Sequence, residues 1–363
     1  MSATFKIGGR AIGAGELVLV VAELSANHNG ELEEAVRLVH AAKAAGADAV
    51  KLQTYTPATM TLPSSDGPFR IADGTMWEGR NLFDLYGEAQ TPWEWYPTLD
   101  RVAKDEGLIL FSTPFDPTAV AFLEEMHSPA YKIASFELVD LPLLRRVAAT
   151  GKPVILSTGM ATIAEIEEAI ATLRSSGATA IALLKCTSAY PARPDDMNLR
   201  AIPDMVARFG LPVGLSDHTM NPAVPVAAVT LGACIVEKHL TLSRSVPGPD
   251  SQFSLEPGEF REMTDAIRTA EMALGTAAYG PGPSEQPSLM FRRSLFVVRQ
   301  VRAGELFTSE NVRPIRPATG LHPRYLEDIL GCRANQDLVP GTPLRWEVVA
   351  DRPEKEPSPP TPS

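Results

Sequence analysis

The sequence predicts a (β/α)₈ barrel. Eight short apolar segments recur between residues 17 and 236, each typical of a buried strand. Most are followed by an amphipathic stretch with helical spacing, such as Glu31–Ala45 or Ile163–Ser175. Strands that alternate with helices favour a closed parallel barrel. The eight segments are Leu17–Ala22, Ala47–Leu52, Leu108–Ser112, Ala130–Ile133, Pro153–Leu156, Ala180–Leu184, Leu211–Leu215 and Ala233–Val236.

Polar residues follow all eight segments. The carboxyl ends of barrel strands form the rim that carries the active site, so we expect these side chains to meet there. They are Glu23, Lys51, Gln53, Thr113, Lys132, Ser135, Glu137, Ser157, Lys185, Ser188, Tyr190, Ser216, His218 and His239. The 62-residue gap between Lys51 and Thr113 predicts an insertion within Thr54–Thr91, and long loops of this kind often cover active sites.

Two histidines follow neighbouring predicted strands, His218 in GLSDHT and His239 in VEKHL. One βα unit separates them, so their imidazoles can become neighbours at the rim. Two imidazoles without a sulfur ligand suit a divalent ion such as Mn²⁺ that keeps open positions for water and substrate. A single histidine is more often an ordinary hydrogen-bonded residue, so the metal hypothesis depends on the pair.

The charge balance limits the partners. A formal net charge of −11 argues against nonspecific nucleic-acid binding. An anionic small ligand remains possible, because lysines at strand ends could supply local positive charge, although a single lysine is usually a solvated surface group. The candidates are Lys51, Lys132, Lys185 and Lys238.

The sequence indicates a cytoplasmic protein. Its three scattered cysteines are typical of reduced thiols. The N-terminus lacks the apolar core of a signal peptide, and no apolar run reaches the roughly 18 residues of a membrane span. We therefore expect neither secretion nor membrane insertion.

A chain of 363 residues exceeds the roughly 250 of a typical (β/α)₈ barrel, so a second domain is expected. Gly and Pro residues over Gly275–Pro287 suggest a linker, and the β-like segments RSLFVV and GTPLRWEVV flank several turns beyond it. The Pro-rich end PEKEPSPPTPS cannot bury apolar surface and should be disordered. The expected parts are a catalytic barrel with an N-terminal extension over 1–275, a linker over 276–289, a small domain over 290–350 and a tail over 351–363.

Motifs in matching order from about Phe5 to Val349 resemble the nonulosonic acid synthases, which are the sialic acid synthase family. The motifs are AELSANHNG (22–30), KLQTYTP (51–57), FSTPFD (111–116), YKIASFE (131–137), STGMAT (157–162), LKCTSAYP (184–191), GLSDHT (214–219) and VEKHLTLSRSVPGPDSQFSLEP (236–257). The resemblance implies a metal-dependent enzyme that condenses phosphoenolpyruvate with an N-acetylated amino sugar through C–O cleavage. The C-terminal segment resembles the antifreeze-like SAF domain, a β-clip fold, which does not imply ice binding.

The resemblance also implies roles for individual residues. It assigns proton transfer and water orientation to Glu23 and Asp250, although Asp250 could instead start a helix or turn. It assigns a divalent ion, Mn²⁺, Mg²⁺ or Co²⁺, to His218 and His239. The phosphoenolpyruvate ligands are Lys51, Thr113, Lys132, Ser157, Ser188 and Ser216. Sialic acid synthases commonly have Asn where this chain has Ser188. The sugar ligands are Gln53, Glu137, Tyr190 and Arg316.

In this family the C-terminal domain reaches over the partner subunit's barrel, so the resemblance implies a domain-swapped homodimer. Arg316 would touch the sugar's acetamido group from the partner chain, the alternative being an ordinary surface arginine. Within the family, the segments look most like members that use 2,4-diacetamido-2,4,6-trideoxy-altrose. N-acetylneuraminate or legionaminate synthesis remains the alternative. A metal-dependent aldolase and a non-catalytic sugar-binding protein are rivals from other classes.

Overall fold

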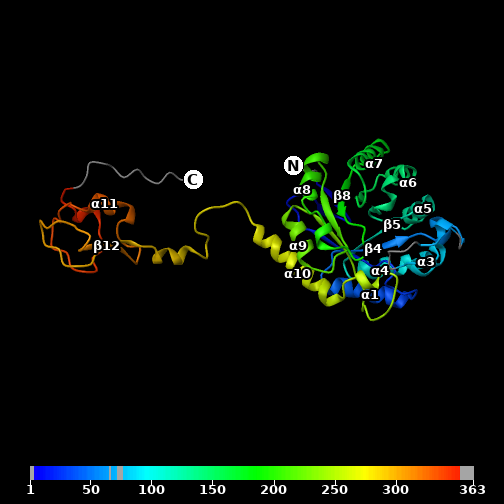
Figure 1. Cartoon of the computed structure of the whole chain (residues 1–363), viewed down its shortest axis with the longest axis horizontal. Helices are drawn as coiled ribbons and strands as arrows, with labels where there is room; N and C mark the ends of the chain where they lie inside the picture. Colours follow the sequence, from blue (N-terminus) through cyan, green and yellow to red (C-terminus); the bar gives the residue numbers. More distant parts are fainter. Residues whose placement is uncertain (1–3, 65–66, 72–76, 352–363) are drawn as a thin grey trace. The chain divides into compact units, whose positions relative to one another are not determined.

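The computed structural model describes residues 4–64, 67–71 and 77–351. The chain divides into two compact units, Met1–Gly275 and Thr276–Ser363 (Figure 1). Apart from Asp351, the tail expected over 351–363 lies outside the described residues. No helix in the described part of the chain is long and apolar enough to cross a lipid bilayer.

The first unit confirms the predicted (β/α)₈ barrel. Eight parallel strands close in the order β10-β3-β4-β5-β6-β7-β8-β9, and each overlaps one of the apolar segments recognised in the sequence. The strands are β3 (Leu19–Glu23), β4 (Ala49–Thr54), β5 (Ile109–Pro114), β6 (Tyr131–Ile133), β7 (Val154–Ser157), β8 (Ile181–Cys186), β9 (Val213–Asp217) and β10 (Ile235–His239).

Helices surround the barrel (Figure 1). They are α1 (Leu32–Ala44), α4 (Tyr96–Asp105), α5 (Pro117–Glu125), α6 (Leu141–Ala148), α7 (Ile163–Ser175), α8 (Ala201–Phe209), α9 (Ala223–Thr230) and α10 (Pro257–Leu274). Several begin at a side-chain cap that the sequence supplies. Thr162 and Glu165 form a reciprocal capping box at the start of α7, and Asp116 accepts hydrogen bonds from the first turn of α5.

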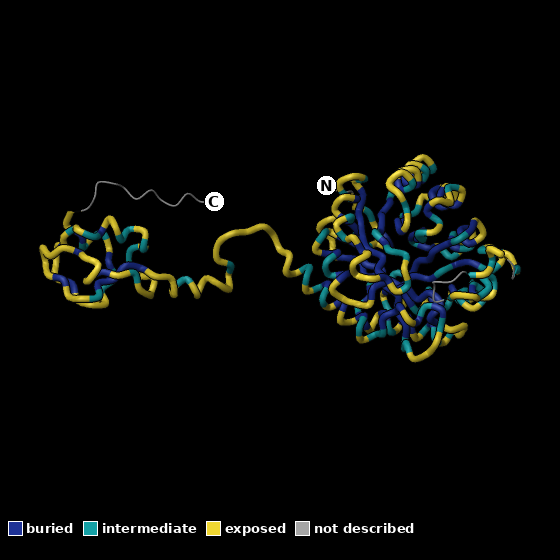
Figure 2. Tube along the Cα trace, in the orientation of Figure 1, coloured by how far each residue is buried: buried dark blue, intermediate teal, exposed yellow. Residues whose placement is uncertain are grey.

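The strands are buried (Figure 2), and their apolar side chains form two separate core clusters. In β10, Ile235 packs inside the barrel and Val236 packs outside it against the helices. The other strands alternate in the same way, because successive side chains of a strand point to opposite faces. The inner space is tight: a Cβ at Gly214 would lie 2.4 Å from the carbonyl oxygen of Ile235.

Two further features belong to the first unit. An N-terminal antiparallel hairpin, β1 (Phe5–Ile7) and β2 (Arg10–Ile12), packs Ile7 and Ile12 against the inner core near the starts of the strands. The hairpin was not expected from the sequence. Between β4 and α4 lies the expected insertion, which includes α2 (Pro57–Met60) and α3 (Leu82–Ala89).

The second unit has a small apolar core of its own. RSLFVV contributes β11 (Ser294–Val297), which pairs with β12 (Val312–Ile315), and a short helix α11 (Leu326–Ile329) follows. GTPLRWEVV differs from the β-like expectation. It makes only isolated bridges at Pro343 and Val349 and contains a 3₁₀ turn at Trp346–Val348.

Candidate active site

A layer of buried polar side chains lies on the inward face of the barrel, beyond the inner apolar core. Glu23 and Lys51 are adjacent in the strand register, and Lys51 Nζ lies 2.5 Å from Glu23 Oε2. Lys51 also donates to Thr113 Oγ1 at 3.2 Å. Burial alone would lower the pKa of Lys51, but the carboxylates of Glu23 and Glu237 raise it. This ammonium group is therefore a fixed positive charge inside the barrel.

Lys132 supplies a second buried ammonium group. It is 2% exposed and donates to Ser157 Oγ at 2.7 Å. Burial lowers its pKa from the usual lysine value. Two lysines and two hydroxyl residues that were predicted to bind phosphoenolpyruvate therefore lie in hydrogen-bonded pairs on the same inner face.

Glu237 joins these pairs and was missed in the sequence analysis. Its Oε1 lies 3.6 Å from Lys51 Nζ and 3.8 Å from Lys132 Nζ, and Ser216 Oγ donates to it at 3.4 Å. Burial alone would raise the pKa of Glu237, but the two lysines lower it. A signal was available, because strand alternation puts Glu237 on the same face as His239.

His218 and His239 are brought together as predicted, with ring centroids 5.4 Å apart. His218 Nδ1 lies 3.0 Å from the carbonyl oxygen of Thr187, so this nitrogen carries a proton and donates it to that oxygen. Burial alone would lower the pKa of His218, but Cys186 and Thr187 raise it. Burial lowers the pKa of His239 well below its usual value, which favours the neutral imidazole that binds metals. In the described part of the chain, Nδ1 of His239 is buried without a hydrogen-bond partner.

These two imidazoles fit a divalent ion with open coordination positions. Within the described residues no group of three or more His, Cys, Asp or Glu side chains is arranged to hold a metal. Water and substrate oxygens would have to complete the coordination, as in open catalytic sites.

Cys186 adjoins the histidine pair, with Sγ 3.9 Å from His218 Nδ1. Burial alone would raise its pKa, but His218 lowers it to about 7.

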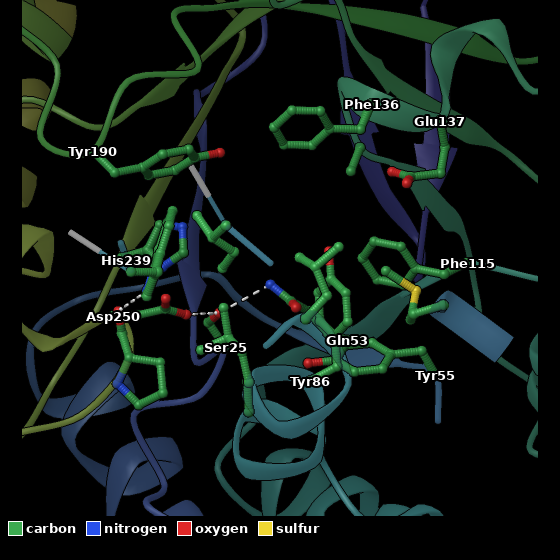
Figure 3. A pocket seen from close by; sticks show the side chains of 18 of the residues that line it. Ser25, Gln53, Tyr55, Tyr86, Phe115, Phe136, Glu137, Tyr190, His239 and Asp250 are labelled. Carbon is green, nitrogen blue, oxygen red and sulfur yellow. Dashed lines mark hydrogen bonds between the residues drawn. The ribbon is translucent and has the colours of Figure 1, made fainter. Parts of the chain in front are cut away.

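Asp250 lies beside His239 in the wall of a pocket (Figure 3). Its Oδ2 accepts hydrogen bonds from Ser25 Oγ and from the backbone N–H of Ala26. Asp250 precedes a 3₁₀ turn over Ser251–Phe253 but makes no side-chain capping bond there. Gln53 connects it to Glu23, because its Nε2 donates to Glu23 Oε1 at 3.1 Å and to Ser25 Oγ at 2.9 Å.

A cavity of about 350 Å³ opens next to this network. Figure 3 shows His239, Asp250, Ser25 and Gln53 along one side of it and Glu137 across from them. The remaining wall is largely apolar, and α2 and α3 of the insertion contribute to it. Its residues include Tyr55, Met60, Ile71, Trp77, Leu82, Leu85, Tyr86, Phe115, Phe136 and Phe253.

Tyr190 is held over the histidines by ring contacts. Its ring centroid lies 4.5 Å from that of His218 and 5.0 Å from that of Phe253. Ser188 is also near this end of the barrel, because its Oγ lies 3.8 Å from Cys186 Sγ. A Cβ at Gly159 would lie 2.3 Å from Ser188 Oγ and 2.7 Å from Ser135 Oγ, so the glycine leaves room for both hydroxyl groups.

Two lysines expected at the rim do not join the site, and that part of the prediction was wrong. Lys238 forms a buried ion pair with Asp217 at 2.7 Å, on the face of β10 opposite Glu237 and His239. Lys185 donates to the carbonyl oxygen of Cys186 and to Thr187 Oγ1.

Arg316 is exposed in the second unit, where it lines a surface hollow with Arg293 and Arg313.

Comparison with known proteins agrees with this geometry. A family model for the NeuB family matches residues 38–279, and one for the SAF domain matches residues 292–350. The chain belongs to the NeuB family. The prediction of this family and of its C-terminal SAF domain is confirmed.

Relatives of this NeuB-family chain cover nearly its whole length. It is 45% identical to the pseudaminic acid synthase of Helicobacter pylori, over 90% of this chain and 96% of the relative. It is 35% identical to the N,N'-diacetyllegionaminic acid synthase of Legionella pneumophila, over 96% and 99%. Among solved structures, the N-acetylneuraminic acid (sialic acid) synthetase of Leptospira borgpetersenii in complex with citrate has a TM-score of 0.71 and 30% identity, covering 80% of this chain and 96% of that one.

Glu137→Gln should change how stability depends on pH. Burial raises the pKa of Glu137 to about 7, and within the described residues its Oε2 has no hydrogen-bond partner. The folded protein therefore binds this proton more tightly than the unfolded chain, in which the pKa is about 4.3. Wild-type protein loses stability as pH rises between these values, and the glutamine variant lacks this loss.

Thermal denaturation at pH 5 and pH 8 measures the effect. The Tm of Glu137→Gln relative to wild type should be higher at pH 8 than at pH 5. Glu168→Gln, at an exposed position of α7, is the matched control and should show no such difference. An equal Tm difference at both pH values for Glu137→Gln would contradict the assignment.

Proposed function

We propose that this protein is a pseudaminic acid synthase. It condenses phosphoenolpyruvate with 2,4-diacetamido-2,4,6-trideoxy-altrose to give pseudaminic acid and phosphate. One observation carries the proposal. Buried lysines paired with hydroxyl groups lie in the same barrel as an apolar cavity, and two histidines lie beside that cavity. Identity of 45% to a pseudaminic acid synthase, against 35% to a legionaminic acid synthase, supports this choice of sugar.

Phosphoenolpyruvate carries a phosphate and a carboxylate, and the inner face of the barrel offers donors for both. Lys51 and Lys132 provide charge, while Thr113, Ser157 and Ser216 provide short hydroxyl donors. We assign Ser188 to the same group; its Oγ lies 3.8 Å from Cys186 Sγ. The low exposure of the two lysines and of Thr113, Ser157 and Ser216 keeps bulk water from competing for the anion.

The cavity suits a sugar that is poor in hydroxyl groups. Two acetamido methyl groups and the C6 methyl group of the trideoxy sugar can pack against Met60, Leu85 and Phe115. N-acetylmannosamine would place hydroxyl groups against the same wall without hydrogen-bond partners. Gln53, Glu137 and Tyr190 provide the polar contacts that orient the sugar.

The reaction joins C3 of phosphoenolpyruvate to the aldehyde carbon of the open-chain sugar, and the aldehyde oxygen takes up a proton. Positive charge then develops at C2. The oxygen of a water molecule bonds to C2, the C2–O bond breaks, and phosphate leaves with the bridging oxygen. Of the two protons that the water gives up, one balances the proton taken up by the aldehyde oxygen and the other goes to the departing phosphate. We assign proton transfer and water orientation to Glu23 and Asp250, which Ser25 and Gln53 connect by hydrogen bonds.

His218 and His239 would hold the divalent ion Mn²⁺, Mg²⁺ or Co²⁺. When bound, it supplies Lewis acidity that polarises the sugar aldehyde. The hydrogen bond from His218 Nδ1 to Thr187 fixes the orientation of the imidazole ring toward the metal.

The three cysteines are free thiols, which supports a cytoplasmic location for this synthase.

Other activities make different demands on the site. Synthesis of N-acetylneuraminate or legionaminate would need the same anion site with a different sugar pocket. A metal-dependent aldolase would need the histidines but not two buried lysines with hydroxyl partners, and it would release no phosphate. A non-catalytic sugar-binding protein would need no carboxylate such as Glu23 beside the histidines. Release of phosphate that depends on both substrates separates the synthases from these last two classes.

Chelation should abolish turnover, and Mn²⁺, Co²⁺ or Mg²⁺ should restore it. Calorimetric titration with Mn²⁺ tests the ligands independently of activity. His218→Ala and His239→Ala should fold but bind Mn²⁺ at least about 100-fold more weakly, because each removes one of two protein ligands. His40→Ala, at an exposed position of α1, is the control. Full activity in excess chelator would contradict the metal role.

The trideoxy sugar should be preferred to N-acetylmannosamine by at least about 100-fold in kcat/KM. Leu85→Ala, which removes a 7% exposed side chain from the cavity wall, should reduce that preference. Leu62→Ala, at a 60% exposed position of the same insertion, should leave it unchanged. Steady-state kinetics with phosphate detection measure both, and a preference for N-acetylmannosamine would instead identify an N-acetylneuraminate synthase.

We also propose a domain-swapped homodimer in which Arg316 contacts the sugar bound to the partner's barrel. Heterodimers of Arg316→Ala and His239→Ala chains should then regain activity, because one of the two sites receives an intact barrel and an intact arginine. Arg302→Ala, another exposed arginine of the second unit, should be fully active alone. No recovery despite confirmed subunit exchange would refute the contact in trans.

A further inference from the structure

Lys51 and Lys132 share one carboxylate. Glu237 Oε1 is within 3.6 Å of the first ammonium group and 3.8 Å of the second. All three side chains are buried, with 4%, 2% and 5% exposure respectively. Like charges held this close in a medium of low dielectric repel strongly, so the shared carboxylate offsets a repulsion that would otherwise separate the lysines.

The distances leave hydrogen-bond donors unused. Lys51 forms a close ion pair with Glu23 and donates to Thr113, and Lys132 donates to Ser157 and to the carbonyl oxygen of Ile133. An ammonium group has three protons. Both distances to Glu237 exceed the usual range of a protein N–H···O hydrogen bond, so Glu237 attracts the two lysines mainly through its charge.

Glu237 also lies outside the wall of the sugar cavity. The residues that line that cavity include His239, on the same strand, but not Glu237, Lys51 or Lys132. An effect of Glu237 on substrate binding should therefore act on the anion that binds the lysines and leave the sugar largely unaffected.

From this geometry we propose that Glu237 is a positioning residue for phosphoenolpyruvate. It holds the Lys51 and Lys132 ammonium groups together, each with a proton free for the incoming anion, and it orients Ser216 through its hydroxyl. The inference rests on the proposed function, because it names phosphoenolpyruvate as the anion. In this role Glu237 makes no contact with the sugar and transfers no proton.

The direct test is calorimetric binding of phosphoenolpyruvate to the full-length Mn²⁺-loaded protein in the absence of sugar. Glu237→Gln keeps the size of the side chain but removes its charge. Its affinity for phosphoenolpyruvate should fall at least about tenfold, while the KM for the sugar changes less than about threefold and Mn²⁺ affinity is unchanged. Affinity for phosphoenolpyruvate that is unchanged or higher would overturn the inference.

Asp217→Asn is the matched control. It also removes a buried carboxylate beside a buried lysine, Lys238, on the outward face of the neighbouring strands. It should lower stability without a specific loss of phosphoenolpyruvate affinity. If it produces the same loss as Glu237→Gln, the effect is a general consequence of removing buried charge and the inference fails.

Glu237→Asp covers the case in which the glutamine variant does not fold. It keeps the charge but withdraws the carboxylate by one methylene, so affinity for phosphoenolpyruvate should fall at least about threefold with the sugar KM unchanged. Unchanged affinity in a folded aspartate variant would overturn the inference. Wild-type protein that binds no phosphoenolpyruvate would instead refute the proposed function.

Discussion

Alternation of side chains along eight closed parallel strands is the constraint on which the site depends. Inward positions are apolar near the strand starts and polar near the strand ends, so the same backbone that packs the core also aims the polar groups. Burial makes each charge costly unless an opposite charge lies beside it. Lys51 with Glu23, and both lysines with Glu237, meet that requirement while leaving donors for an anion.

The site has a polar part and an apolar part, and different elements of the fold supply them. The strand ends provide charge and hydroxyl groups, whereas the insertion after β4 provides an apolar wall through residues such as Met60 and Leu85. An anion and a sugar rich in methyl groups can therefore bind side by side, and Figure 3 shows His239 and Asp250 on the wall of the cavity. A loop insertion can change the sugar without disturbing the anion site, because the two use different elements.

Much of this could be predicted from the sequence, since apolar runs identify the eight strands and the residues after them identify the rim. Errors arose where the face of a strand mattered. Lys238 was expected at the rim but points outward to Asp217, while its neighbour Glu237 was overlooked although it points inward. The N-terminal hairpin was missed because three-residue strands carry little periodicity. GTPLRWEVV looked β-like by composition, but its pairing depends on tertiary contacts.

We propose that this barrel binds phosphoenolpyruvate and breaks its C–O bond during condensation with the amino sugar. The most direct measurement uses phosphoenolpyruvate labelled with ¹⁸O at the oxygen that bridges C2 and phosphorus, followed by mass spectrometry of both products. The label should appear in inorganic phosphate, because water supplies the new oxygen at C2. Label retained in the nonulosonic acid would show P–O cleavage and would contradict it.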